Sequence, residues 1–162
     1  MAAHLPAIVP ANLHGTAIAM AGNAVLIRGR SGAGKSDLAL RAVAIAPSPL
    51  LPHQALLVAD DRVLASASGA DVYLGCPSSL EGMIEVRGVG IVKVPFVSTA
   101  KLALVVDLVE GAAVDRLPEP TEPAIICGLA IPRLVLAPFE SSAAIKLLLA
   151  LERASRPPDG IR

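Results

Sequence analysis

The chain has 162 residues, and its 14 basic and 14 acidic side chains give a formal net charge of zero, which argues against nucleic acid as a partner. Although 54% of the residues are hydrophobic, charged residues and prolines interrupt every apolar run before about 18 residues, so we expect no membrane span, and residues 1–10 lack the basic start of a signal peptide. Cys76 and Cys127 lack the spacing of metal ligands, and we expect both to be buried, reduced thiols of a cytoplasmic protein.

The first predicted elements surround a glycine-rich loop. Residues 14–21 alternate loosely in polarity, and after a Gly-Asn turn residues 24–28 form a compact apolar run, so we expect two antiparallel strands. At Lys35 the apolar spacing becomes helical, and the helix must end before Pro47. The loop is therefore predicted to lie between a strand and a helix.

The middle of the chain predicts strands and hairpins. Residues 55–59 indicate a buried strand that ends at Asp60 and Asp61, and residues 62–66 and 72–75 flank a glycine-containing turn typical of a hairpin. Residues 80–94 contain a further apolar segment in which two closely spaced glycines indicate a bend.

The C-terminal part predicts more strands and one helix. The expected elements are a strand at 102–109, a surface loop at 117–123, one or two strands at 124–136, a helix capped by Ser141 or Ser142 that runs to Leu151, and a flexible tail at 155–162. Strands outnumber helices and often follow one another without a helical crossover, which favours an α/β fold with a mixed, largely antiparallel sheet and flanking helices. We expect a single domain over residues 1–162.

The glycine-rich loop fits the pattern G-x-x-x-x-G-K-[ST], which binds phosphate groups when it lies between a strand and a helix. Its residues are Gly29, Arg30, Ser31, Gly32, Ala33, Gly34, Lys35 and Ser36. The glycines let backbone N–H groups turn toward one anion, and the helix N-terminus adds partial positive charge. Lys35 is expected to reach terminal phosphates, and Ser36 to bind Mg²⁺.

Acidic residues near the predicted strand ends are candidates for the rest of a phosphotransfer site. Asp60 and Asp61 are adjacent, so one can serve a metal and the other a nucleophile, although either can instead cap a turn. Glu85 and Arg87 would share one face of a strand, an arrangement that an exposed ion pair would also produce. By itself, His14 is typical of a structural hydrogen-bond donor, and Arg116 of a solvated loop charge; their roles stay open at the level of single residues.

Together, these residues resemble the catalytic domain of HPr kinase/phosphorylase, a bacterial enzyme that phosphorylates a serine of the phosphocarrier protein HPr. The resemblance covers roughly residues 12–138. It is carried by His14-Gly15, the G-R-S-G-A-G-K-S loop, V-A-D-D-R-V at 58–63, E-V-R-G-V-G-I at 85–91 and D-R-L at 115–117.

The resemblance implies a role for each matching residue. ATP phosphates would bind to residues 29–36, with Ser36 and Glu85 on Mg²⁺ and Asp60 beside them. Asp61 would accept the serine proton and donate it in the reverse reaction. The other catalytic side chains would be Lys35, His14 and Arg116, and Arg87 would support the phosphate site. The resemblance also implies a fold related to phosphoenolpyruvate carboxykinase, HPr as the protein substrate, and a homo-oligomer, since the family forms hexamers.

The chain departs from the family pattern at three places. Only about a dozen residues precede His14, which resembles the shortened form found in alphaproteobacteria. Arg30 stands where the family loop usually has Asp. The family's P-x-x-x-G-R segment, linked to dephosphorylation, corresponds to Pro138-Phe139-Glu140-Ser141-Ser142-Ala143, with neither Gly nor Arg at those positions. The resemblance thus implies the kinase reaction and leaves the phosphorylase reaction open.

Two other functions are compatible with a phosphate-binding loop. A small-molecule kinase would be expected to have a lid with clustered arginines, and residues 47–55 contain no arginine. A non-catalytic ATP-binding regulator would be expected to lose a member of the catalytic set, whereas Lys35, Asp60, Asp61 and Glu85 are all present.

Overall fold

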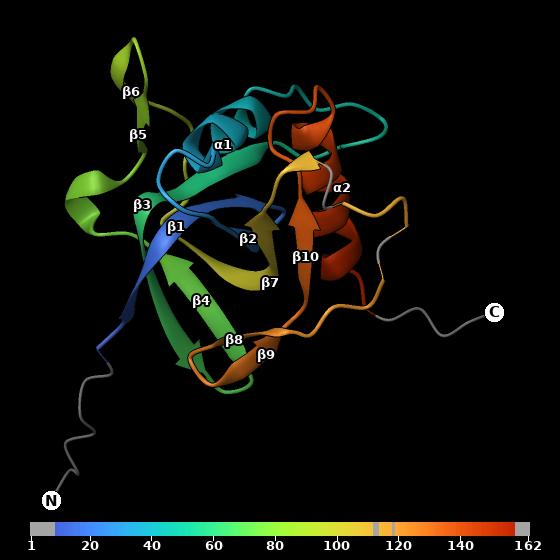
Figure 1. Ribbon diagram of the computed structural model, residues 1–162. Coiled ribbons are helices and arrows are strands. Elements are labelled where there is room, and N and C mark those ends of the chain that lie inside the picture. Colours follow the sequence, from blue (N-terminus) through green and yellow to red (C-terminus); the bar gives the residue numbers. More distant parts are fainter. Residues whose placement is uncertain (1–8, 112–113, 118, 158–162) are drawn as a thin grey trace, which may run out of the picture.

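The computed structural model describes residues 9–111, 114–117 and 119–157. The elements are β1 (Ala11–Met20), β2 (Asn23–Arg28), α1 (Lys35–Val43), β3 (Ala55–Ser68), β4 (Asp71–Gly75), the 3₁₀ helix η1 (Ser78–Leu80), β5 (Met83–Val86), β6 (Gly90–Lys93), β7 (Thr99–Leu108), β8 (Ala124–Ile126), β9 (Leu129–Ile131), β10 (Arg133–Leu136) and α2 (Ala143–Ser155). Figure 1 shows their arrangement.

The main sheet closes on itself. Its strand order is β10-β7-β2-β1-β3-β4, and β4 also pairs with β7, so β7, β2, β1, β3 and β4 form a ring with β10 attached outside it. The pairs β2–β7 and β10–β7 are parallel, and the other pairs in this sheet are antiparallel. The prediction of an α/β fold with a mixed sheet is confirmed.

Alanine side chains mixed with larger aliphatic ones fill the inside of this ring. Ala17 and Ala19 of β1 belong to a buried cluster with Ala24 and Leu26 of β2, while the alternate residue Ile18 belongs to a second cluster on the helical side. Successive strand residues point to opposite faces, and a ring of few strands leaves little interior room. The alanine-rich strands are therefore suited to a closed sheet.

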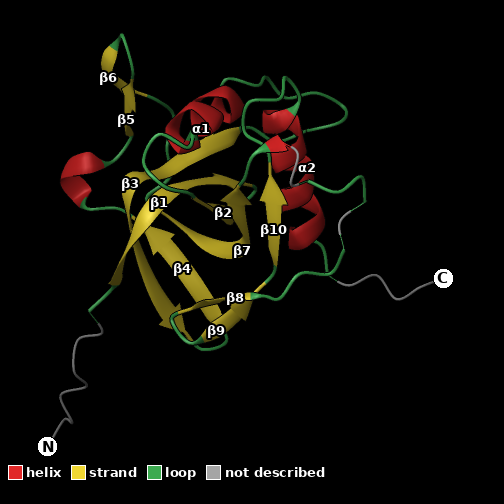
Figure 2. Cartoon of the chain, viewed as in Figure 1, coloured by secondary structure: helices red, strands yellow, loops and turns green. Residues whose placement is uncertain are grey.

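Both helices lie on the same side of the sheet (Figure 2). Leu38 of α1 and Leu147 of α2 are fully buried in a cluster with Ile18, Ile27 and Val106 from the strands. This packing sets the start of α1 against the end of β2, where the glycine-rich loop connects them. None of the helices in the described ranges is long and apolar enough to cross a membrane.

The predicted strand at 55–59 does not end at Asp60. It continues as β3 through Ser68, because β1 extends back to Ala11 and pairs with it along this length. The register shifts between Ala17 and Ile18, where Val58 is the extra residue of β3. Asp61 lies beyond this bulge, pairs with Gly15 and has a positive φ of 67°. A bulge of this kind re-aims side chains without ending the strand.

Three other predictions need correction. Residues 124–136 form three short strands, because β8 and β9 make a separate hairpin and only β10 joins the main sheet. Ser142 occupies the N-cap position of α2 but its hydroxyl makes no capping hydrogen bond, and the helix runs past Leu151 to Ser155. The tail predicted at 155–162 therefore starts later, and residues 158–162 lie outside the described residues.

The prediction that both cysteines are buried is wrong. Cys76 is half-buried, and burial raises the pKa of its thiol. Cys127 is exposed and has a φ of 50°, because it lies in the tight turn between β8 and β9.

Candidate active site

The glycine-rich loop connects β2 to α1 and is shaped by two glycines. Gly32 and Gly34 have φ values of 82° and 95°, a region that residues with a Cβ rarely adopt. The backbone N–H of Ala33 donates to the carbonyl of Arg30 at 3.0 Å, which closes the turn. The loop thus delivers its last residues to the N-terminus of α1, where unpaired N–H groups favour an anion.

Lys35 is held within the loop. Lys35 is only 7% exposed. Its Nζ donates to the carbonyl oxygens of Gly29 at 2.8 Å and Arg30 at 3.0 Å. The ammonium group therefore lies over the loop that the sequence predicts to hold phosphates.

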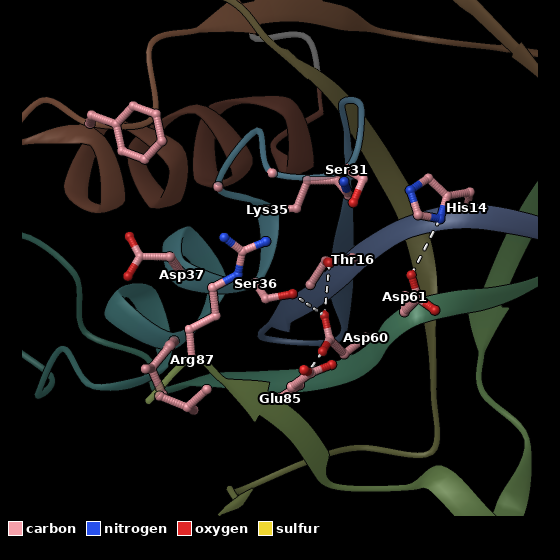
Figure 3. Close-up of a pocket in the computed structure, with 15 residues that line it drawn as sticks. His14, Thr16, Ser31, Lys35, Ser36, Asp37, Asp60, Asp61, Glu85 and Arg87 are labelled. Atoms are coloured by element: carbon pink, nitrogen blue, oxygen red, sulfur yellow. Dashed lines mark hydrogen bonds and ion pairs between the residues drawn. The ribbon is translucent and has the colours of Figure 1, made fainter. Parts of the chain in front are cut away.

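Asp60 links four parts of the chain through its carboxylate (Figure 3). Its Oδ1 accepts hydrogen bonds from Ser36 Oγ at 2.6 Å and from Thr16 Oγ1 at 3.0 Å, and its Oδ2 accepts from the backbone N–H of Glu85 at 3.3 Å. β1, α1 and the start of the β5–β6 hairpin thereby converge on one carboxylate.

Asp61 points away from Asp60 toward His14 (Figure 3). His14 Nδ1 lies 3.4 Å from Asp61 Oδ1, and the two side chains are 56% and 75% exposed. In the β1–β3 register Gly15 faces Asp61 and Thr16 faces Asp60. Successive strand residues normally point to opposite faces, but Asp61 has a positive φ and both carboxylates line the same cavity. The two carboxylates therefore have different partners, and their separate roles stay a prediction.

The close approach of β2 explains why a glycine, Gly15, follows His14. A Cβ at this position would lie 2.8 Å from the carbonyl oxygen of Ile27, closer than packed atoms allow. The absent side chain lets β1 approach β2 just beside the glycine-rich loop.

A cavity of about 500 Å³ is lined by most of the predicted site residues, although not by Gly29. Its walls include His14, Ser31, Gly32, Gly34, Lys35, Ser36, Asp60, Asp61, Glu85 and Arg87. Arg30 and Ala33 instead line a second, neighbouring cavity. Arg116 is exposed and lines neither cavity.

Glu85 and Arg87 come from the β5–β6 hairpin, which projects from the body of the protein (Figure 1). β5 ends at Val86, so Glu85 lies on the strand and Arg87 in the turn. The simple argument that both residues share one face of a strand does not apply, yet both line the cavity.

The acidic residues suit a metal that is also bound by phosphates. Among the described ranges, no three His, Cys, Asp or Glu side chains gather into a cage that could hold a metal alone. Mg²⁺ usually takes one or two carboxylates together with substrate phosphates and water. The hydroxyl of Ser36 against the carboxylate of Asp60 fits that donor set.

Thr16 is a site residue that the sequence argument missed. It is fully buried and donates to Asp60. Its spacing is a usable signal, since residues 14 and 16 lie on the same side of an extended strand.

A charged cluster below the loop was also missed. Arg28, which precedes Gly29, donates from Nε and Nη2 to Asp107 Oδ1 and Oδ2 at 2.7 and 2.9 Å, and Arg133 Nε donates to Oδ2 at 2.5 Å. Burial opposes the charge of Asp107, but hydrogen bonds from Arg28 and Arg133 outweigh it and lower the pKa of this carboxyl. The cluster ties together the ends of β2 and β7 and the start of β10.

The segment after β10 lies against the loop. The Cβ position of Gly34 is 3.0 Å from Cε1 of Phe139, whose side chain is exposed and lines both cavities. Arg41 of α1 donates to the carbonyl of Pro138 and, at 2.9 Å, to Asp37. The sequence did not indicate a role for Phe139, because residues 138–143 depart from the family's P-x-x-x-G-R segment.

Comparisons with known proteins show which family the chain is similar to. A family model of the HPr Serine kinase C-terminal domain matches residues 8–152. The HPr kinase/phosphorylase of Burkholderia lata is 35% identical over 156 residues, which cover 90% of this chain and 45% of that protein. The HPr kinase/phosphorylase of Azoarcus sp. is 37% identical over 157 residues, with coverages of 90% and 47%.

The chain spans about half the length of the curated relatives it matches. Among solved structures, the HPr(Ser) kinase/phosphatase of Coxiella burnetii superposes with a TM-score of 0.71 at 24% identity, covering 88% of this chain and 96% of that chain. This likeness supports the fold.

Proposed function

Because the chain belongs to the HPr serine kinase C-terminal domain family, we propose that it is a catalytic domain that transfers the γ-phosphoryl group of ATP to a serine of HPr. In this proposal residues 1–162 form one domain with a P-loop fold of the type shared by HPr kinases and phosphoenolpyruvate carboxykinase, and residues 29–36 hold the phosphates.

One observation carries the proposal: the glycine-rich loop and the carboxylate of Asp61 line the same cavity. Phosphoryl transfer requires a cradle for the phosphates and a group that positions the nucleophile, and most of its catalysis is positioning and charge stabilisation. A cavity with both parts supports this reaction.

Phosphate binding would rest on the loop and on Lys35. Backbone N–H groups at the start of α1 would donate to an anion, and the helix dipole would add attraction. Lys35 now donates to Gly29 and Arg30; contact with terminal phosphates would replace these carbonyl acceptors with charged ones, which make stronger hydrogen bonds. Arg87, on the cavity wall, would add a guanidinium.

Ser36, Asp60 and Glu85 would hold Mg²⁺ in this site. When bound, Mg²⁺ neutralises charge on the β- and γ-phosphate oxygens. Thr16 and the N–H of Glu85 hold the Asp60 carboxylate in place, so this ligand is oriented before any nucleotide arrives.

Asp61 would accept the proton of the substrate serine while the serine Oγ bonds to the γ-phosphorus and the bond from that phosphorus to the β–γ bridging oxygen breaks. His14, 3.4 Å from Asp61, would orient the carboxylate. In the reverse direction inorganic phosphate would attack phosphoserine, Asp61 would return the proton to the serine oxygen, and pyrophosphate would leave.

Arg116 lies outside the cavity walls, so its proposed catalytic role requires the protein substrate or a second copy of the chain to complete the site. The homo-oligomer implied by the family likewise stays a prediction, which sedimentation can check.

The test is incubation of the protein with γ-labelled ATP, Mg²⁺ and HPr. We expect label on a serine of HPr. Label on a metabolite would indicate a small-molecule kinase, and nucleotide binding without transfer would indicate a regulator. Incubation of serine-phosphorylated HPr with inorganic phosphate, followed by a pyrophosphate assay, tests the reverse reaction.

A further inference from the structure

The second cavity, of about 970 Å³, adjoins the glycine-rich loop and is lined by Glu110 and Glu140 but not by Asp60, Asp61 or Glu85. Residues 30–33 form one wall, residues 108–111 at the end of β7 a second, and residues 137–140 after β10 a third. None of the groups proposed to bind metal or move a proton lines it. The cavity shares Ser31, Gly32 and Phe139 with the first one.

A nucleotide whose phosphates bind to the glycine-rich loop must have its γ-phosphate and its nucleoside at opposite ends of the loop. A nucleoside triphosphate is a linear chain, and in the proposed reaction its γ-phosphate must lie beside Asp60 and Asp61. The nucleoside is joined to the opposite end of that chain, so it must leave the loop away from the acids. The second cavity adjoins the loop and is lined by neither of these aspartates.

Phe139 is placed where the two cavities meet. Its ring packs over Gly34, with Cε1 3.0 Å from the Cβ position of that glycine, yet 75% of the residue is exposed. Arg41 anchors the preceding carbonyl of Pro138 to α1. The chain has only two phenylalanines, one tyrosine and no tryptophan. One of these few aromatic rings thus lies exposed against the glycine-rich loop.

We propose that the adenine of ATP binds in the second cavity and stacks on the ring of Phe139. This inference rests on the proposed function, because it needs a nucleotide whose phosphates occupy the glycine-rich loop. A base has a flat face that stacks on aromatic rings, and Leu108, Val109 and Ala137 supply apolar wall for its edges.

The first experiment separates the base from the phosphates. Binding of ATP and of inorganic tripolyphosphate is measured by calorimetry for the unmodified protein and for Phe139→Ala. We expect the substitution to weaken ATP binding about tenfold, the usual loss for one base–aromatic stack, and to leave tripolyphosphate binding unchanged. Equal weakening of both ligands, or no weakening of ATP, overturns the proposal.

The second experiment uses the absence of native tryptophan. In Phe139→Trp we expect ATP to quench the indole fluorescence and tripolyphosphate to leave it unchanged. Phe96→Trp is the matched control, because Phe96 is 45% exposed and lines neither cavity; we expect neither ligand to change its emission. Equal responses of the Phe139 and Phe96 reporters to ATP contradict stacking.

The outcomes distinguish this inference from the proposed function. ATP-specific quenching without transfer to HPr supports the base site and contradicts the kinase proposal. Transfer to HPr with ATP binding insensitive to Phe139 supports the kinase and overturns the base site. An unmodified protein that binds neither ATP nor tripolyphosphate overturns both.

Discussion

Arg28 of β2 donates two hydrogen bonds, at 2.7 and 2.9 Å, to Asp107 of the parallel strand β7. Arg28 is the last residue of β2, and the glycine-rich loop begins at the next residue. The position of the loop therefore depends on an ion pair between residues that are 79 positions apart.

Asp107→Ala should destabilise the fold. It leaves Arg28 and Arg133 without their shared acceptor, and a half-buried charged donor without a partner costs about 1–3 kcal/mol. Urea unfolding measures the change. Asp71→Ala is the control, because the Asp71–Lys101 pair is exposed and should contribute under about 1 kcal/mol. Equal losses in the two variants would contradict a special role for Asp107.

The stabilisation by Asp107 should disappear in acid. Although burial opposes its charge, hydrogen bonds from Arg28 and Arg133 lower the pKa of Asp107 in the folded state. Its contribution is therefore present above the unfolded-state pKa of about 3.9 and is lost as the pH falls through the lowered folded-state value. We expect the difference in unfolding free energy between the unmodified protein and Asp107→Asn to be constant above about pH 5 and to shrink below about pH 4. A difference that grows on acidification would refute this assignment.

Lys35→Met should lower kcat for phosphoryl transfer by about 10²–10³-fold, because it removes a positive charge from the position where negative charge develops. Steady-state kinetics with HPr and ATP measure the effect, and circular dichroism checks that α1 is retained. Lys101→Met, which removes an exposed lysine outside both cavities, should keep nearly full activity. Full activity of the Lys35 variant would overturn the site assignment.

Asp61→Asn should leave ATP affinity nearly unchanged while transfer collapses, because the amide cannot accept the serine proton. Asp60→Asn should instead weaken Mg²⁺-dependent ATP binding, since Asp60 lies against Ser36. Calorimetry with and without Mg²⁺ separates the two variants. A comparable loss of ATP binding in Asp61→Asn would mark that residue as a metal or folding residue.

Gly15→Ala should destabilise the protein by about 1–3 kcal/mol, because its Cβ would lie 2.8 Å from the backbone oxygen of Ile27, which cannot rotate away. Thermal unfolding measures the loss. The control is Gly111→Ala, whose Cβ would make an ordinary contact of 3.8 Å with Ala137. Equal stability of the two variants would show that β1 and β2 can separate without cost.

The sequence was sufficient for the local parts of the site. The loop between β2 and α1 was predictable because its glycines, its lysine and the helical spacing after it are all short-range signals. The adjacency of Asp60 and Asp61 allowed separate partners for the two carboxylates, but the positive φ of Asp61 was not predictable from it. The end of β3 was not predictable, because continuation past Asp61 depends on pairing with the distant strand β1.

Residue order alone thus predicted the glycine-rich loop and the acidic pair at residues 60 and 61, since these features need only bond geometry and a few consecutive side chains. Only the tertiary structure shows the closure of the strand ring, the Arg28–Asp107 pair and the position of Phe139 over Gly34. Each of these joins segments far apart along the chain, and their contact is set by the packing of the whole core, which no local pattern encodes.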